Sequence, residues 1–432
     1  MTNYKRSLKS LKSKPMFSSL KPKSEFSRNV LTLMTGTTIA QAIPIAISPI
    51  LTRIYTPEDF GVLALYMSVA SILSVAATGR YEMAIMLPKK EEDAINIVVL
   101  SIAISLFVSF LSLIIISVFN SQITNLLGNP DISNWLYFIP VMVLLTGVYQ
   151  SLNYWSNRKK QYKRLAVSRV VQSGTAATVN LGMGFSGFGS SGLIVGSVVG
   201  QAIVTSILSK MIWNEDKAKS HFINRLKILA MARRYVKFPK YDIFASLSNV
   251  SAHQITHILF NALFNSTIAG YFYLTQKILS LPITFIASTI SDVFRQSATK
   301  EYQQFGNAKK IYVSTFKKLF VLSFFPSLIL YLYSVELFVF IFGEQWSVAG
   351  EYAKILVPML FLKFISSPLS FMLYIAEKQA INMYSQFLFL FSIFIGFLIG
   401  DNEYEVITYI SWLFSCIYLH YMYLSAKIAK LF

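Results

Sequence analysis

The chain has 432 residues, of which 54% are apolar, 15% aromatic and only 14% charged. Soluble domains carry about 25% charged residues and cannot bury so many apolar side chains, so an ordinary soluble enzyme and a disordered chain are both excluded. A single cysteine, Cys416, excludes a disulfide framework and a thiolate metal cluster.

Apolar stretches long enough to cross a bilayer follow one another along the chain. About 20 mostly apolar residues span the roughly 30 Å hydrocarbon core, and backbone groups in lipid must be satisfied within the segment, so each stretch should be a helix. The sequence therefore predicts an all-α polytopic membrane protein with about twelve transmembrane helices. They cover 30–51, 61–79, 94–118, 135–153, 169–185, 192–213, 242–264, 267–290, 318–340, 353–375, 380–400 and 404–425.

The predicted segments divide the chain into two similar halves. Residues 1–29 form a basic, serine-rich tail, 30–213 a first bundle of six helices, 214–241 a linker, 242–425 a second bundle of six helices and 426–432 a short tail. The tail 1–29 lacks the cleavage site of a signal peptide, so we interpret it as solvated, with contact to anionic headgroups as the alternative. Gly61 and Gly270 open the second and eighth stretches in similar surroundings, which predicts parallel repeats.

The positive charges predict the orientation in the membrane. The formal net charge is +19, which would suggest nucleic-acid binding in a soluble protein. Almost all of the 39 Lys and Arg residues lie in the N-terminal tail and in alternate connections, whereas the other connections hold only Arg53. Because positive connections stay in the cytoplasm, both termini are predicted to be cytoplasmic, and the charge sets topology instead of binding nucleic acid.

Two lysines fall deep inside predicted spans. Lys277 and Lys363 lie about nine or ten residues into the eighth and tenth stretches, roughly 15 Å deep at 1.5 Å per residue. A cation at this depth is unfavourable, so we expect a water-filled cavity that receives an anion. Snorkelling or pairing with backbone carbonyls is the alternative. Helical spacing places polar residues on the same face as each lysine. Ser280, Thr284 and Ser288 share the face of Lys277, and Ser366, Ser367 and Ser370 share the face of Lys363.

Other polar residues are weaker candidates. Gln41 in the first span and Asn249 in the seventh are predicted to face the same cavity. His253 and His257 are one helical turn apart and could carry protons, bind a metal or form interhelical hydrogen bonds. Arg53 and Arg80 lie at opposite ends of the first helical hairpin, where they either assist an anion or anchor at headgroups.

No recognised catalytic or metal-binding motif occurs in the sequence. A Walker loop, HExxH and GxSxG are all absent, and no connection is large enough for a catalytic domain. We therefore expect no catalytic residues, no bound metal and no cofactor.

Several short motifs resemble those of a known family. The stretch 51–61 (LTRIYTPEDFG) resembles the first inter-span turn of bacterial polysaccharide flippases. The stretch 79–84 (GRYEMA), followed by Pro88, is similar to the next segment of the O-antigen, Wzx-type branch of the multidrug/oligosaccharidyl-lipid/polysaccharide exporter superfamily. In the second half, a basic residue precedes a proline in the eighth span, and the matching residues are Pro239, Gly270, Lys277 and Pro282. The lipid II branch has arginines in its first span, where this chain has Gln41 and no cation, so that branch's anion site does not carry over in detail.

The resemblance implies a V-shaped pair of six-helix bundles around a central cavity, alternating between inward-open and outward-open forms. The implied substrate is an undecaprenyl-diphosphate-linked oligosaccharide, moved from the cytoplasmic to the periplasmic leaflet of the bacterial inner membrane. Lys277 and Lys363 would attract the diphosphate, with Arg53 and Arg80 near the two mouths. Membrane lipids, a polysaccharide polymerase and a chain-length regulator would be partners, and coupling to H⁺, Na⁺ or the membrane potential stays open.

Two other functions are compatible with a chain of many spans. A MATE-like antiporter for organic cations would need carboxylates within its spans, and the first six spans contain none away from their ends. A membrane glycosyltransferase or polymerase would need a constellation of catalytic acids and bases, and the sequence contains none.

Overall fold

The computed structural model describes residues 25–376 and 378–431. Over these residues the regular secondary structure is helical, which confirms the all-α prediction. Every predicted span falls on a helix. Seven helical stretches are long and apolar enough to cross a membrane on their own, and eight if one bent pair is counted as a single span, so the number twelve stays a prediction. Residues 1–24 of the predicted tail lie outside the described residues. Residues 25–29 belong to the first helix.

The first half of the chain forms the N-terminal bundle. Its helices are α1 (Glu25–Ile54), α2 (Pro57–Ala76), α3 (Glu91–Leu127), α4 (Ser133–Leu136), α5 (Ile139–Arg158), α6 (Tyr162–Phe185) and α7 (Ser190–Asp216). Short 3₁₀ helices, η2 (Tyr81–Met86) and η3 (Pro130–Ile132), connect them. Thr56 and Asp59 form a reciprocal capping box at the start of α2, and Pro57 occupies the first helical turn, so this sharp turn is encoded locally.

The second half forms the C-terminal bundle. Its helices are α9 (Ile243–Leu263), α10 (Ser266–Leu279), α11 (Ser288–Phe305), α12 (Lys309–Phe342), α13 (Ser347–Leu369), α14 (Met372–Ile375), α15 (Gln379–Ile399) and α16 (Glu403–Ile428). A one-turn π-helix, η6 (Ile283–Ala287), connects α10 to α11, and a 3₁₀ turn, η7 (Glu344–Trp346), precedes α13.

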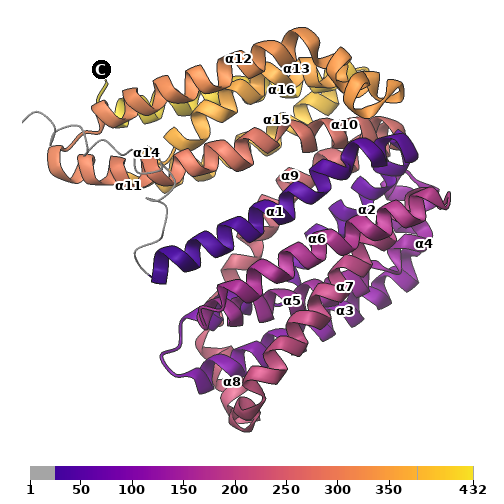
Figure 1. The fold of residues 1–432 in the computed structure, drawn as a ribbon, viewed down its shortest axis with the longest axis vertical. Helices are drawn as coiled ribbons and strands as arrows, with labels where there is room; N and C mark the ends of the chain where they lie inside the picture. The colour runs from indigo at the N-terminus through magenta and orange to yellow at the C-terminus, as the bar shows by residue number, and fades with distance from the viewer. Residues whose placement is uncertain (1–24, 377, 432) are drawn as a thin grey trace, which may run out of the picture.

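The two bundles meet at one end of the molecule and diverge toward the other (Figure 1). At the joined end, defined here by residues 52–61 and 266–270, α2 crosses α10. Helix α9 lies along both α2 and α10, and the side chain of Ser68 on α2 donates a 3.0 Å hydrogen bond to Gln254 on α9. The diverging end carries the C-terminus and the start of α1 (Figure 1).

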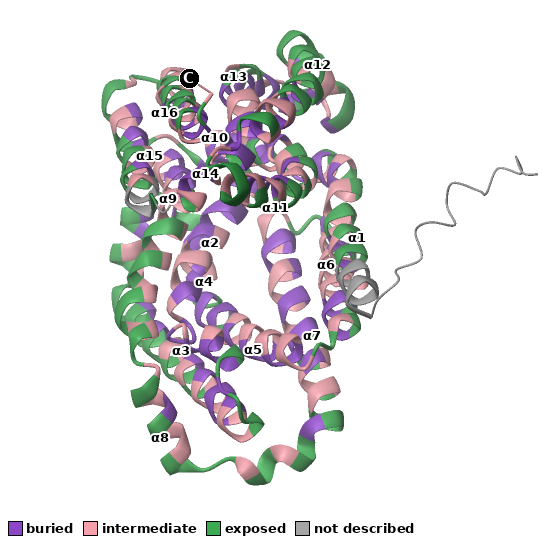
Figure 2. Ribbon diagram, turned by 90° about the vertical axis from the view of Figure 1, so that its left-hand side faces the viewer, coloured by how far each residue is buried: buried purple, intermediate pink, exposed green. Residues whose placement is uncertain are grey.

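Large apolar side chains cover much of the outer surface. Figure 2 shows many exposed residues on the outer helices, and several are large hydrophobics: Phe107, Phe110, Phe325, Phe340, Phe391 and Leu398. A soluble monomer rarely exposes apolar patches of this extent, whereas lipid chains cover them at no cost. The chain is therefore a multi-pass membrane protein.

Three predicted spans differ from single straight helices. The span at 135–153 is formed by α4 and α5, which are bent by 49° relative to each other. The span at 267–290 is interrupted after α10, because Pro282 has no N–H to continue the helical hydrogen bonding and a π-helical turn follows it. The span at 353–375 breaks between α13 and α14, just after Pro368.

The predicted linker 214–241 is docked onto the N-terminal bundle. It contains the end of α7, a 3₁₀ helix η4 (Lys217–Phe222), α8 (Arg225–Arg234) and a π-helical turn η5 (Phe238–Asp242). The fully buried amide of Asn96 on α3 donates to the carbonyl of Phe222 at 3.0 Å and accepts from the amide of Asn224 at 2.9 Å. The side chain of Asn96 thus satisfies two backbone groups of the linker that would otherwise bond to water.

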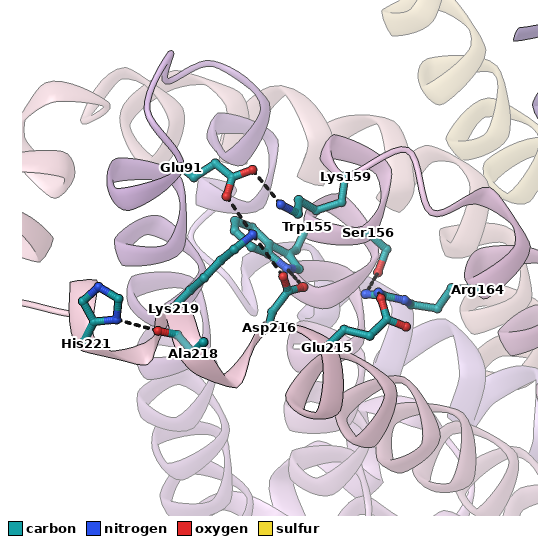
Figure 3. A network of polar contacts seen from close by, with 10 residues as sticks. All are labelled: Glu91, Trp155, Ser156, Lys159, Arg164, Glu215, Asp216, Ala218, Lys219 and His221. Carbon is teal, nitrogen blue, oxygen red and sulfur yellow. Dashed lines mark hydrogen bonds and ion pairs between the residues drawn. The ribbon is translucent and has the colours of Figure 1, made fainter. Parts of the chain in front are cut away.

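A polar network ties α3, α5 and η4 together beside this linker (Figure 3). The indole N–H of buried Trp155 donates to Asp216 at 3.0 Å. Lys219 lies within ion-pair distance of Asp216 and Glu91, and Lys159 pairs with the same Glu91 at 2.6 Å. Opposite charges therefore alternate across these helix ends, which holds them in one arrangement.

Candidate functional site

A cavity of about 280 Å³ lies inside the C-terminal bundle, between α9, α10, α13, α15 and α16. Polar side chains from all five helices line it: Asn249, His253, Thr256, Gln276, Ser280, Lys363, Ser366, Ser367, Ser370, Gln386, Tyr418 and Tyr421. Among the described lining residues, Lys363 is the only Lys or Arg, and no carboxylate occurs. The cavity therefore offers one lysine amine, several hydroxyl and amide groups and aromatic rings.

The polar stripe on α13 faces this cavity as the helical spacing predicts. Lys363 and the three serines that follow at one- and two-turn spacing all line it. The hydroxyl of Ser370 donates back to the carbonyl of Ser367 at 2.8 Å. Serine hydroxyls bonded in this way keep lone pairs available as acceptors and can rotate to donate to a ligand. Lys363, Ser366, Ser367 and Ser370 thus share one wall of this cavity, and their role in substrate binding stays a prediction.

Lys277 lies on a different face of α10. Phe272 and Gln276 on α10 and Ser280, which follows the helix directly, line the cavity at intervals of four residues. Successive residues of a helix point about 100° apart. Because Gln276 points into the cavity, its neighbour Lys277 points away from it. The ammonium of Lys277 lies 5.8 Å from the ring centroid of Tyr273, a cation–π distance. The structure thus separates the two lysines that we expected to act together, and an anion-binding role for Lys277 stays a prediction.

The two histidines of α9 also have different surroundings. His253 lines the cavity. His257 is buried, with its ring centroid 5.5 Å from that of Phe272 and 5.7 Å from that of Tyr273, and its Nδ1 has no hydrogen-bond partner in the described structure. His257 is not among the residues that line the cavity, so the spacing of four residues does not give the two histidines a common site there. The described residues contain no cluster of three potential metal ligands.

Arg53 lies at the joined end and connects the two bundles. Its guanidinium donates to the carbonyl oxygens of Ile341 at 2.8 Å and Phe340 at 3.2 Å, in the last turn of α12. The C-terminal end of a helix carries partial negative charge and unsatisfied carbonyls, so a cation is favourable there. Nearby, the indole N–H of Trp346 donates to the carbonyl of Thr52 at 2.9 Å. Arg53 therefore caps a helix of the other bundle, and we leave it out of the candidate anion site.

Arg80 has two carboxylate partners. It lies 3.1 Å from Glu82 and 2.7 Å from Asp242, which precedes α9. Glu82 is almost fully buried and also accepts a hydrogen bond from Thr78. Burial raises the pKa of Glu82, while the hydrogen bond from Thr78 and the charge of Arg80 act in the opposite direction. Arg80 is thus paired with carboxylates of the protein itself, and it is not part of the candidate anion site.

Gln41 does not line this cavity, and sequence reasoning overlooked several residues that do. Gln41 lies exposed on α1 in the other bundle, and its predicted place in a cavity between the bundles stays a prediction. Gln276, Gln386, Tyr418 and Tyr421 were missed. A glutamine inside the strongly apolar span 380–400 was an available signal, because an uncompensated amide in lipid is unfavourable.

Glycines allow the helix backbones to touch at the joined end. A methyl group at Gly61 would lie 1.8 Å from the carbonyl oxygen of Ser266, and one at Gly270 would lie 1.8 Å from the carbonyl oxygen of Pro57. Pro57 and Ser266 are the first residues of α2 and α10, so the contact is reciprocal. Residues with a Cβ atom cannot fit here without separating the bundles.

Two solved transporter structures share this architecture. The chain superposes on the inward-facing conformation of a multidrug resistance MATE family transporter of the MOP superfamily with a TM-score of 0.70 and 13% identity, covering 93% of this chain and 98% of that one. It superposes on the lipid II flippase MurJ in an inward closed conformation with a TM-score of 0.69 and 12% identity, covering 92% and 87%. These likenesses establish the fold, which is that of membrane transporters.

The overlap is smaller with an outward-facing MATE family transporter. There the TM-score is 0.52 at 13% identity, although the match covers 93% of this chain and 96% of that one.

Sequence comparison identifies the family. No curated protein sequence matches the chain. A family model described as polysaccharide biosynthesis protein matches residues 50–351, which is more than half of the chain and includes the joined end, Arg80 and the start of α13. The chain therefore belongs to the polysaccharide biosynthesis protein family.

Proposed function

We propose that the protein is a flippase for a lipid-linked oligosaccharide joined to its lipid through a diphosphate, and that Lys363 attracts the diphosphate. The observation that carries this proposal is the cavity itself, which has a cation and hydroxyl groups in its wall and no carboxylate among its described lining residues. The family membership and the likeness to transporters support it.

A flippase must lower the cost of moving sugars and charge through hydrocarbon. Desolvating hydroxyls and ionised oxygens without partners is very unfavourable. Hydroxyl and amide groups on the wall can replace water around sugars, aromatic rings can stack on them, and Lys363 can pair with a phosphate oxygen. We propose that the lipid chain stays in the bilayer while the headgroup occupies the cavity.

The orientation follows from the distribution of charge. Positive connections predict a cytoplasmic location for both termini, which assigns the diverging end to the cytoplasm and the joined end to the periplasm. The closer similarity to an inward-facing transporter supports the same assignment. In this proposal the protein lies in the bacterial inner membrane and serves O-antigen or a related surface polysaccharide, with the polymerase and chain-length regulator as downstream partners.

A small-molecule antiporter is the second candidate, because the chain also shares the fold of a MATE family transporter. An organic cation would be repelled by Lys363 and would find no carboxylate in the described cavity wall. The charge of the cavity therefore favours an anionic substrate.

The decisive experiment measures which leaflet holds the lipid-linked glycan. Spheroplasts of a deletion strain are labelled from outside with an impermeant sugar-reactive probe, with and without the restored gene. We expect labelling to require the gene and to fall at least tenfold with Lys363→Gln. The matched control is Lys354→Gln, on the same helix but outside the cavity lining, which should label as wild type. Equal labelling with and without the gene contradicts the proposal.

A further inference from the structure

We propose that His253 supplies a second positive charge to the cavity, taking up a proton when the diphosphate binds. This inference rests on the proposed function and deepens it by specifying how the charge of the substrate is balanced. In this proposal His253 contacts the substrate, whereas His257 does not.

The first observation is geometric. His253 on α9 and Lys363 on α13 line the same cavity of about 280 Å³. The two basic groups therefore face one space from two helices, and a ligand held in that space can contact both. His257 is excluded from this role because its ring is buried against Phe272 and Tyr273.

The second observation concerns the groups that face His253. Helix α9 contributes Asn249 and Thr256, α10 contributes Gln276 and Ser280, α15 contributes Gln386, and none of these titrates near neutrality. The other titratable groups in the wall are Lys363, Tyr418 and Tyr421. Because the described wall contains no carboxylate, it offers no negative charge to a protonated His253 in the absence of a ligand, and the charge of Lys363 repels one.

Charge counting then predicts what binding does. A diphosphate esterified at both ends keeps one ionised oxygen on each phosphorus and lacks the second ionisation that gives phosphomonoesters a pKa near 6, so it carries two negative charges. Lys363 balances one of them. In a cavity surrounded by hydrocarbon, the remaining charge strongly favours a cation beside it. Histidine, with an ordinary pKa of about 6.5, acquires that charge by taking a proton from water near neutral pH.

The test is a binding titration on the full-length protein in detergent. The probe is farnesyl-diphosphate-linked N-acetylglucosamine, a doubly esterified diphosphate whose own charge is constant between pH 6 and pH 8.5. If His253 is neutral in the free protein and protonated in the complex, Kd should weaken about tenfold for each pH unit between the pKa of His253 in the free protein and its pKa in the complex. In weakly buffered solution near pH 7.5, binding should take up close to one proton per complex.

Three variants separate the contribution of His253 from those of other residues. His253→Gln should abolish both the pH slope and the proton uptake while the probe still binds. His420→Gln, an exposed histidine on α16 outside the cavity lining, should keep the wild-type slope. Lys363→Gln should weaken binding at every pH.

The outcomes distinguish this inference from the proposed function. A wild-type Kd that is independent of pH, or a slope that survives in His253→Gln, overturns the inference while Lys363-dependent binding upholds the flippase proposal. Absence of binding to wild-type protein, or binding that is indifferent to Lys363→Gln, overturns both.

Discussion

Gly61 of α2 and Gly270 of α10 face each other across the joined end, so closely that a methyl group at Gly270 would lie 2.9 Å from the backbone nitrogen of Gly61. The two glycines that open the predicted repeats thus form one contact. In the proposed flippase, alternating access would separate the bundles at one end while they close at the other, so we expect this crossing to break when the joined end opens.

Gly270→Leu should hold the joined end apart. The reporter is Ser266→Cys in a Cys416→Ser background, because Ser266 is buried at the crossing. We expect an impermeant maleimide to label this cysteine at least fivefold faster when Gly270 is leucine. The control is Gly174→Leu on α6, where a Cβ atom meets no other group within 4 Å. Unchanged labelling in Gly270→Leu would show that the crossing does not close this end.

Arg53→Gln should loosen the same end without changing substrate affinity. The substitution removes a charged donor from the carbonyls of Phe340 and Ile341, and exposed helix-end interactions of this kind contribute about 0.3–1 kcal/mol. We expect faster labelling of the Ser266→Cys reporter and an unchanged Kd for the doubly esterified diphosphate probe. A tenfold loss of affinity would instead assign Arg53 to the substrate.

Arg80→Gln should destabilise the protein, because it leaves buried Glu82 beside Asp242 without its cation. Removing one partner of a buried ion pair costs about 3–5 kcal/mol, and the partial exposure of Arg80 reduces the expected loss to about 1–3 kcal/mol. Thermal unfolding in detergent measures it. The double variant Arg80→Gln with Glu82→Gln should recover part of the loss, and no recovery would contradict the pairing.

The pH dependence of the stability should show that the pKa of Glu82 is raised in the folded protein. Burial raises its pKa in the folded protein above the ordinary value of 4.5, so the folded state binds the proton more tightly than the unfolded state. Stability from this group is therefore present below pH 4.5 and is lost as the pH rises through the folded pKa. The stability of wild type relative to Glu82→Gln should fall over this window. A difference that rises or stays flat would contradict this.

Asp216→Ala should cost about 1–3 kcal/mol, because it leaves the buried indole N–H of Trp155 without an acceptor. Asp216→Asn keeps an acceptor oxygen and loses the ion pair with Lys219, so it should be milder. Thermal unfolding of the two variants separates these contributions. Equal losses would attribute the effect to charge alone.

The sequence was sufficient for the features that depend on local chemistry. Apolar length placed a helix at every predicted span, and helical spacing correctly grouped Lys363 with Ser366, Ser367 and Ser370 on one face. The motif at 51–61 also contained its own capping box, Thr56 with Asp59, because a cap involves neighbours a few residues apart.

Tertiary packing decided which charged groups are available to a ligand. The sequence could not reveal that Arg53 caps α12 or that Arg80 meets Asp242, because each partner lies on a distant segment of the chain. Lys277 contacts Tyr273 of its own helix, but its absence from the cavity lining depends on how α10 is rotated. The same rotation brought Gln276 into the cavity and left His257 against aromatic rings. Sequence alone therefore determined a polytopic helical protein with cations inside its spans, whereas helix rotation and crossing, set by contacts between distant segments, decided that Lys363 and His253 share one cavity.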